Sequence, residues 1–145
     1  ETEAADLADR LPQGQRADRL FAEHGPDTSD AIAAATCAAA EMLNAPIILC
    51  LTKSGFTARK IAAYRPTVPI IGLTTEPRTY HQLALTWGVQ AALAKSMPTY
   101  DEMWEVARRY LLSRNYVPEG ASVVVTAGVP FDVSGTTNLL KVEVV

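Results

Sequence analysis

The stretch Ile47-Ile48-Leu49-Cys50-Leu51-Thr52-Lys53-Ser54-Gly55-Phe56-Thr57 decides the fold class of this chain. Its first five residues form an unbroken apolar run, which is typical of a parallel strand covered on both faces. Polar residues and a glycine follow at once, where the strand ends and a helix from about Ser54 to Tyr64 begins. A buried strand that leads directly into a helix predicts an α/β fold.

The alternation of strand and helix continues on both sides of this stretch. An alanine-rich helix precedes it from about Ala31 to Leu43, with Thr28-Ser29-Asp30 supplying capping side chains. Apolar periodicity then predicts helices over 79–86 and 99–114, and strands over 69–74, 89–94, 122–126 and 139–144. This order predicts a three-layer α/β/α sandwich around a five-stranded, mostly parallel sheet. No helix joins the last two strands, so we expect the last strand to be antiparallel.

The helix predicted from Thr99 to Arg114 is the clearest amphipathic segment in the chain. Its charged residues Glu102, Glu105 and Arg109 fall opposite the apolar ones. We expect the sheet to be faced by an apolar stripe that consists of Met103, Val106, Ala107, Tyr110 and Leu111.

The composition is that of an ordinary globular protein. The 145 residues are enough for one domain with its own core, and 48% of them are hydrophobic. A formal net charge of −3 argues against a general nucleic-acid binder, which usually carries a basic excess. No apolar run is long enough to span a bilayer, so we expect neither nucleic acid nor a membrane as a partner.

The two cysteines, Cys37 and Cys50, each lie in an apolar run and belong to no metal-ligand cluster. We expect buried, reduced thiols, which favours the cytoplasm as the compartment. A chain that starts at Glu1 rather than Met is interpreted as a fragment or a processed product. Residues 1–27, interrupted by glycine and proline, are predicted to be a connector that precedes a domain over residues 28–145.

The turn after the first strand combines several features of a phosphate site. The first amides of the following helix have no partners inside it, and the helix dipole adds positive potential there. A glycine lets the backbone approach an anion closely, and hydroxyls and a lysine add donors and charge. We therefore predict phosphate binding, without a metal, by Thr52, Lys53, Ser54, Gly55, Phe56 and Thr57. The alternative is that Ser54 and Thr57 only cap the helix.

A second hydroxyl-rich segment consists of Ser134, Gly135, Thr136 and Thr137, followed by Asn138. The loop that contains it begins at the carboxyl end of the fourth strand, which is the edge where the phosphate turn also lies. We predict that it closes over a ligand held by that turn. Taken alone, the segment is better interpreted as a plain surface turn.

Conventional catalytic groups are sparse. Neither His24 nor His81 has an acid or a nucleophile at motif spacing, so we expect no catalytic residue in this chain. We likewise expect no metal and no other cofactor to bind it. Trp87 and Trp104 are predicted to pack against neighbours rather than to stack on a ligand.

Six motifs, in the same order and at approximately the same spacing, resemble the C-terminal domain of bacterial pyruvate kinases over about residues 28–145. They are Thr52-Lys53-Ser54-Gly55, Tyr64-Arg65-Pro66, Pro69-Ile70-Ile71, Trp87-Gly88-Val89, Thr126-Ala127-Gly128-Val129-Pro130 and Ser134-Gly135-Thr136-Thr137-Asn138. The resemblance implies a domain that binds allosteric activators and forms a subunit interface. The family's catalytic barrel, which uses Mg²⁺ and K⁺, needs roughly 250 residues, so we expect it outside this chain and as a partner of it.

The resemblance also implies where an activator binds. Its phosphate would lie in the turn Thr52–Thr57, under the loop that corresponds to Ala127–Asn138. Relatives that respond to fructose 1,6-bisphosphate hold the second phosphate with a tryptophan and an arginine, whose places fall near Ser96 and Met103 here. Neither residue can do that, so we expect a single-phosphate activator such as a sugar monophosphate or AMP.

The last strand is predicted to pair with its own copy, as in the family. Apolar and charged residues alternate along it: Leu140, Lys141, Val142, Glu143 and Val144. An edge strand of this kind is open to pairing with another chain. With a two-fold axis near Val142, Lys141 of one copy would face Glu143 of the other.

Two alternatives to a regulatory domain stay open at this point. A stand-alone enzyme acting on a phosphosugar could use the same turn to orient its substrate, although no residue is nominated as a general base. A purely structural dimerisation module would leave the turn empty.

Overall fold

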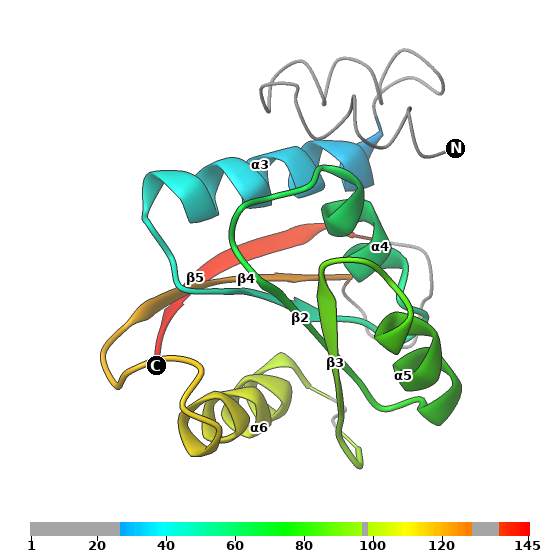
Figure 1. Ribbon diagram of the computed structural model, residues 1–145, viewed down its shortest axis with the longest axis vertical. Coiled ribbons are helices and arrows are strands. Elements are labelled where there is room, and N and C mark those ends of the chain that lie inside the picture. Colours follow the sequence, from blue (N-terminus) through cyan, green and yellow to red (C-terminus); the bar gives the residue numbers. More distant parts are fainter. Residues whose placement is uncertain (1–26, 97–98, 129–136) are drawn as a thin grey trace.

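The computed structural model describes residues 27–96, 99–128 and 137–145 (Figure 1). The helices are α3 (Thr28–Met42), α4 (Phe56–Ala63), α5 (Pro77–Ala84) and α6 (Tyr100–Ser113). The strands are β1 (Ile48–Leu51), β2 (Ile70–Thr74), β3 (Val89–Leu93), β4 (Ser122–Ala127) and β5 (Leu139–Val144). Except for Asp27, the predicted connector lies outside the described residues. Helix α5 starts two residues before the predicted Thr79, because Pro77 occupies its first turn.

The strands form one five-stranded sheet in the order β3-β2-β1-β4-β5. Neighbours from β3 to β4 are parallel, and β5 is antiparallel to β4. Helices α3, α4 and α5 cover one face of the sheet, and α6 covers the other (Figure 1). The predicted three-layer α/β/α sandwich with an antiparallel last strand is confirmed.

The central strand β1 belongs to both hydrophobic cores. Leu49 and Leu51 pack in the core under α6, whereas Ile48 and Cys50 pack in the core under α3 and α4. All four residues are buried. Because successive side chains of a strand point to opposite faces, only an uninterrupted apolar run satisfies both cores.

Helix α3 begins at Thr28, three residues before the predicted Ala31, and its N-cap lies one residue before the predicted capping segment. Asp27 is the N-cap, and its carboxylate accepts a hydrogen bond from the Asp30 amide at 2.8 Å. The Asp30 carboxylate accepts one in return from the Asp27 amide at 3.3 Å, which completes a capping box. The prediction identified Asp30 as a capping residue but missed Asp27. The small residues Ala33 and Ala40 of α3 are fully buried against the sheet, which allows close packing.

The two cysteines are buried free thiols, as predicted. Burial, with a smaller contribution from Glu41, raises the pKa of Cys37 to about 12. Burial also raises the pKa of Cys50, with a smaller contribution from Cys37. Both thiols are therefore protonated at neutral pH and act as small apolar groups between α3 and the sheet.

Helix α6 buries a narrower stripe than predicted. Met103, Ala107 and Leu111 repeat every four residues and are buried in the core, but Val106 is 39% exposed. The prediction that Val106 faces the sheet is therefore wrong. Tyr110, also predicted to face the sheet, is partly buried and packs against the same core, as does Trp104, whereas Val106 lies outside this contact surface. The Thr99 hydroxyl caps the helix by accepting a hydrogen bond from the Glu102 amide at 3.3 Å.

We expect Leu111→Ala to lower the free energy of unfolding by about 2–5 kcal/mol, because it leaves a cavity beneath α6. The matched control is Arg109→Ala on the same helix, whose side chain is 75% exposed and pairs only with Glu105 among the described residues. That control should cost about 0.5 kcal/mol or less. Urea unfolding measures both, and equal costs would contradict the assigned orientation of α6.

Candidate functional site

The turn between β1 and α4 lies at the carboxyl edge of the parallel strands, where α/β sheets bind ligands. Gly55 occupies the N-cap of α4 with φ +83°, in the left-handed region that favours glycine. A Cβ atom on Gly55 would lie only 2.6 Å from Nη1 of Arg59. Glycine therefore suits this position for two reasons: its backbone has a positive φ, and the Arg59 side chain lies close to it.

Hydroxyl groups hold this turn in shape. The Gly55 amide donates to Oγ1 of the buried Thr52 at 2.9 Å, and the Phe56 amide contacts Ser54 Oγ at 3.4 Å. The Lys53 carbonyl accepts hydrogen bonds from the hydroxyls of two residues outside the turn, Thr79 at 2.7 Å and Thr74 at 3.3 Å. The hydroxyls of Thr52 and Ser54 thus already have partners within the turn, so they organise it.

The groups that remain for an anion are backbone amides and cations. Thr57 and Ala58 lie in the first turn of α4, where amides have no acceptor inside the helix. Lys53, two residues before the N-cap of the helix, is exposed. Arg59, also exposed, donates from Nη1 to the Ser54 carbonyl at 3.2 Å, so its guanidinium lies over the turn. Arg59 is not among the predicted site residues, although it stands one helical turn after Gly55 and could have been found by that spacing.

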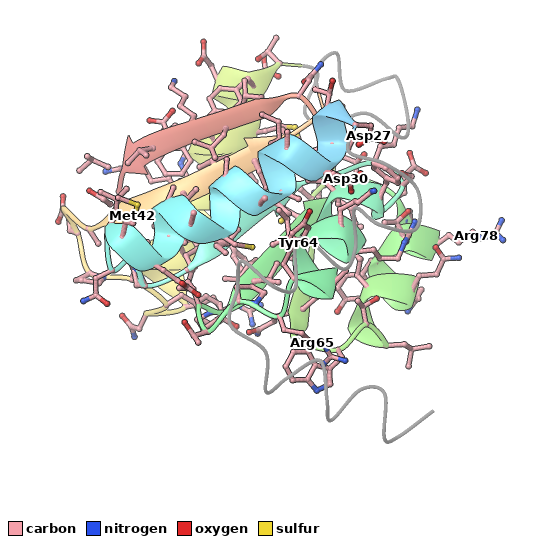
Figure 2. The ribbon with its side chains drawn as sticks, turned by 90° about the horizontal axis from the view of Figure 1, so that it is seen from above. Asp27, Asp30, Met42, Tyr64, Arg65 and Arg78 are labelled. Carbon is pink, nitrogen blue, oxygen red and sulfur yellow. The ribbon has the colours of Figure 1, made fainter. Side chains whose placement is uncertain are left out.

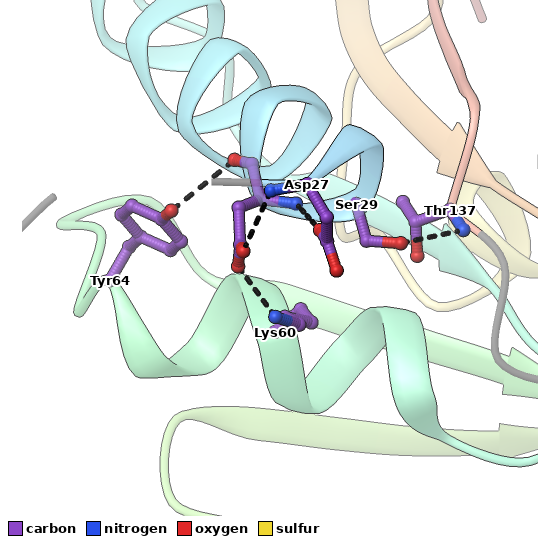
Figure 3. A network of polar contacts seen from close by, with 6 residues as sticks. Asp27, Ser29, Lys60, Tyr64 and Thr137 are labelled. Atoms are coloured by element: carbon purple, nitrogen blue, oxygen red, sulfur yellow. Dashed lines mark hydrogen bonds and ion pairs between the residues drawn. The ribbon is translucent and has the colours of Figure 1, made fainter. Parts of the chain in front are cut away.

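The second predicted segment meets the first at Thr137. Its hydroxyl lies 2.8 Å from the hydroxyl of Thr57, and both side chains are buried. The Thr137 amide donates to Ser29 Oγ at 3.2 Å (Figure 3). The other predicted residues of this segment, Ser134, Gly135 and Thr136, lie outside the described residues. Thr137 therefore contacts the segment that follows β1 through the Thr57 side chain.

An ion pair joins α3 to α4 close to this junction. The Lys60 ammonium contacts the Asp30 carboxylate, and the Tyr64 hydroxyl donates to the Asp30 carbonyl at 3.2 Å (Figure 3). Burial acts to raise the pKa of Asp30, but the Lys60 and Asp27 contacts outweigh it and hold that pKa below its usual value. Burial also raises the pKa of Tyr64 to about 12, so its hydroxyl stays a donor at neutral pH.

The comparisons with known proteins agree on one family. The family model described as pyruvate kinase, alpha/beta domain, matches residues 30–143. This chain belongs to that family. Pyruvate kinases from Clostridium acetobutylicum and Lactobacillus delbrueckii subsp. bulgaricus are 43% and 40% identical to it over 119 and 121 residues.

The pyruvate kinase relatives are much longer than the matched region. The alignments cover 82% and 83% of this chain but only 25% and 20% of the relatives from Clostridium and Lactobacillus. The pyruvate kinase from Methylorubrum extorquens, 31% identical, aligns with 99% of this chain and with 32% of its own length. A crystal structure of a pyruvate kinase from Cryptosporidium parvum has a TM-score of 0.78 over 94% of this chain and 27% of its own, and at 22% identity it supports the fold alone.

The two positions named for a second effector phosphate differ in their surroundings. Met103 is buried in the core under α6, and Ser96 is exposed after β3. Trp87 does not pack as predicted, because it is 61% exposed and carries the Arg65 guanidinium 4.0 Å from its ring centre. Trp104 packs against the core, as predicted.

The histidines, possible metal ligands and helix lengths bear on catalysis, metal binding and membrane insertion. His81 is exposed and contacts only the Tyr80 ring among the described side chains, while His24 lies outside the described residues. In the part of the chain that the structure describes, no three His, Cys, Asp or Glu side chains gather as metal ligands. No helix within the described ranges is long and apolar enough to cross a membrane.

We expect the stability of the chain to fall in acid partly through Asp30. Its pKa is lower folded than unfolded, so its contribution is full above about pH 4, the unfolded pKa, and is lost as the pH falls through the folded pKa. Between pH 6 and 2, the fall should be shallower in Asp30→Asn and in Lys60→Met. The control Lys95→Met, which removes an exposed lysine, should retain the wild-type pH dependence, measured by urea unfolding. Identical curves for wild type and Asp30→Asn would contradict this assignment.

Proposed function

We propose that this chain is the regulatory and subunit-interface domain of a pyruvate kinase, and that its β1–α4 turn binds the phosphate of an allosteric activator. The parent enzyme would transfer phosphate from phosphoenolpyruvate to ADP in glycolysis, in the cytoplasm. Its chemistry, with Mg²⁺ and K⁺, would belong to a barrel domain that partners this one. The observation that carries the proposal is the amino end of α4, where a glycine N-cap and first-turn amides lie under the Arg59 guanidinium, with the exposed Lys53 two residues before the cap.

The size of the site favours one phosphate. Lys53 and Arg59 flank a single helix amino end. Met103 is buried among apolar side chains, so it offers no donor to a second phosphate, and Ser96 offers no positive charge. We therefore propose a sugar monophosphate or AMP as the activator.

Ligand-induced stabilisation tests the phosphate site. Glucose 6-phosphate, ribose 5-phosphate or AMP at a hundred times its Kd should add about 2.7 kcal/mol to the free energy of unfolding. Lys53→Met should weaken binding by about tenfold, since it removes a charged donor, whereas Lys95→Met should not. Calorimetry and thermal unfolding measure both effects. Tight binding of fructose 1,6-bisphosphate alone would contradict the single-phosphate proposal.

A separate surface supports self-association. Strand β5 is an edge of the sheet, and Val142 and Val144 are 43% and 61% exposed. Helix α3 lies alongside β5 (Figure 2), and Met42 near its end is 86% exposed. An edge strand beside exposed apolar side chains is suited to pairing with a second copy.

The charge pair between copies stays a prediction. Within one chain the Lys141 ammonium contacts the Glu143 carboxylate at 2.7 Å, and Glu143 also accepts a hydrogen bond from the Tyr100 hydroxyl at 3.0 Å. Reversing Lys141 would therefore disturb the fold of one chain as well as any pairing. An exposed apolar residue of β5 is a cleaner probe.

We expect Val142→Asp to weaken dimers of this chain by at least tenfold, because it places a charge on the paired edge. The matched control is Val106→Asp, which changes a valine of similar exposure on α6, in the opposite layer. Sedimentation equilibrium measures the association. Equal dimerisation of both variants would contradict the β5 interface, and dimers that bind no phosphate would favour a purely structural module.

A further inference from the structure

The amino ends of α3 and α4 meet through one residue that belongs to neither helix. Ser29 is the second residue of α3, and Thr57 is the second residue of α4. The Thr137 amide donates to Ser29 Oγ at 3.2 Å (Figure 3), and the Thr137 hydroxyl lies 2.8 Å from the Thr57 hydroxyl. We call these three residues (Ser29, Thr57 and Thr137) the Thr137 bridge.

The bridge is shielded from water. Ser29, Thr57 and Thr137 are 7%, 2% and 1% exposed. A buried hydroxyl that loses its partner is costly, because no water replaces the lost hydrogen bond. The bridge therefore has one favoured arrangement, and a displacement of Thr57 displaces Thr137 with it.

A second contact ties the same two helices together. Asp30 follows Ser29 in α3, and its carboxylate contacts the Lys60 ammonium of α4 and accepts a hydrogen bond from the Asp27 amide. The amino end of α3 is thus held to α4 on two sides. It is also the point where the described domain joins the residues that precede it in the chain.

We propose that Thr137 is a positioning residue that couples occupancy of the phosphate turn to the amino end of α3. This inference rests on the proposed function of the turn. The backbone amide of Thr57 lies in the first turn of α4, where a phosphate would bind, while its hydroxyl holds Thr137. An anion that immobilises the first turn of α4 therefore also immobilises Thr137, and through the Thr137 amide it immobilises Ser29.

The test uses the 145-residue chain and NMR, with inorganic phosphate and glucose 6-phosphate as probes. The amide chemical shift of Phe56 reports binding. Hydrogen exchange of the Asp30 and Ala31 amides reports the state of α3, because both donate to Asp27. We expect saturating ligand to slow these two amides at least threefold in the wild type and in Thr137→Ser, which keeps the hydroxyl.

The variant that breaks the bridge is Thr57→Val/Thr137→Val. It replaces both hydroxyls by methyl groups of the same shape, which leaves no unpaired partner and preserves the fold. Titration of the Phe56 shift gives the affinity of this variant, and at its own saturating ligand concentration the exchange of the Asp30 and Ala31 amides should no longer respond. A response at α3 that persists in the double variant overturns the proposal.

A second experiment uses no ligand, so it tests the coupling between α3 and α4 independently of phosphate binding. Ser29→Ala removes the acceptor of the Thr137 amide, and it should speed exchange of the Arg59 amide, which donates to the Gly55 carbonyl, at least twofold. In the Thr57→Val/Thr137→Val background it should have no such effect. Equal acceleration in both backgrounds, or none in either, overturns the coupling. Absence of any ligand-induced shift at Phe56 would instead overturn the phosphate site.

Discussion

The burial of β1 on both faces is the constraint on which the rest of the structure depends. The strand lies between β2 and β4, and its side chains enter two separate cores. Helices must therefore cover both faces of the sheet. The antiparallel strand β5 lies at an edge of the sheet. Thr52 is the first polar residue after β1. The turn that follows it therefore lies at the carboxyl edge of the sheet.

Polar side chains in and around the turn form hydrogen bonds to its backbone groups. Hydroxyls of Thr52 and Ser54 bind amides inside the turn, and Thr74 and Thr79 bind the Lys53 carbonyl from outside it. Together they satisfy backbone groups that would otherwise be unpaired near the sheet. The polar groups left for a ligand are first-turn amides and cations, a combination that suits an anion without a metal.

The amino ends of α3 and α4 form a single polar junction on one face of the sheet. The capping box of Asp27 and Asp30, the Lys60 ion pair and the contacts of Thr137 all lie there. Elsewhere the core under these helices consists mainly of apolar side chains, and the buried Thr36 hydroxyl of α3 is bonded within its own helix, to the Ile32 carbonyl. Polar contacts have fixed directions, unlike apolar ones, so this junction defines how the two helix ends sit relative to each other.

The sequence by itself determined the order of the elements along the chain, the parallel sheet with its antiparallel last strand, and the polar turn between β1 and α4. These follow from local periodicity, from the glycine that precedes α4 and from a sequence between the last two strands that lacks helical periodicity. Tertiary structure alone decided the partners of side chains. The Thr57 hydroxyl is paired with Thr137, eighty residues away, and Val106 is left beside the buried row of α6. Long-range contacts of this kind depend on how whole elements pack, which no local pattern encodes.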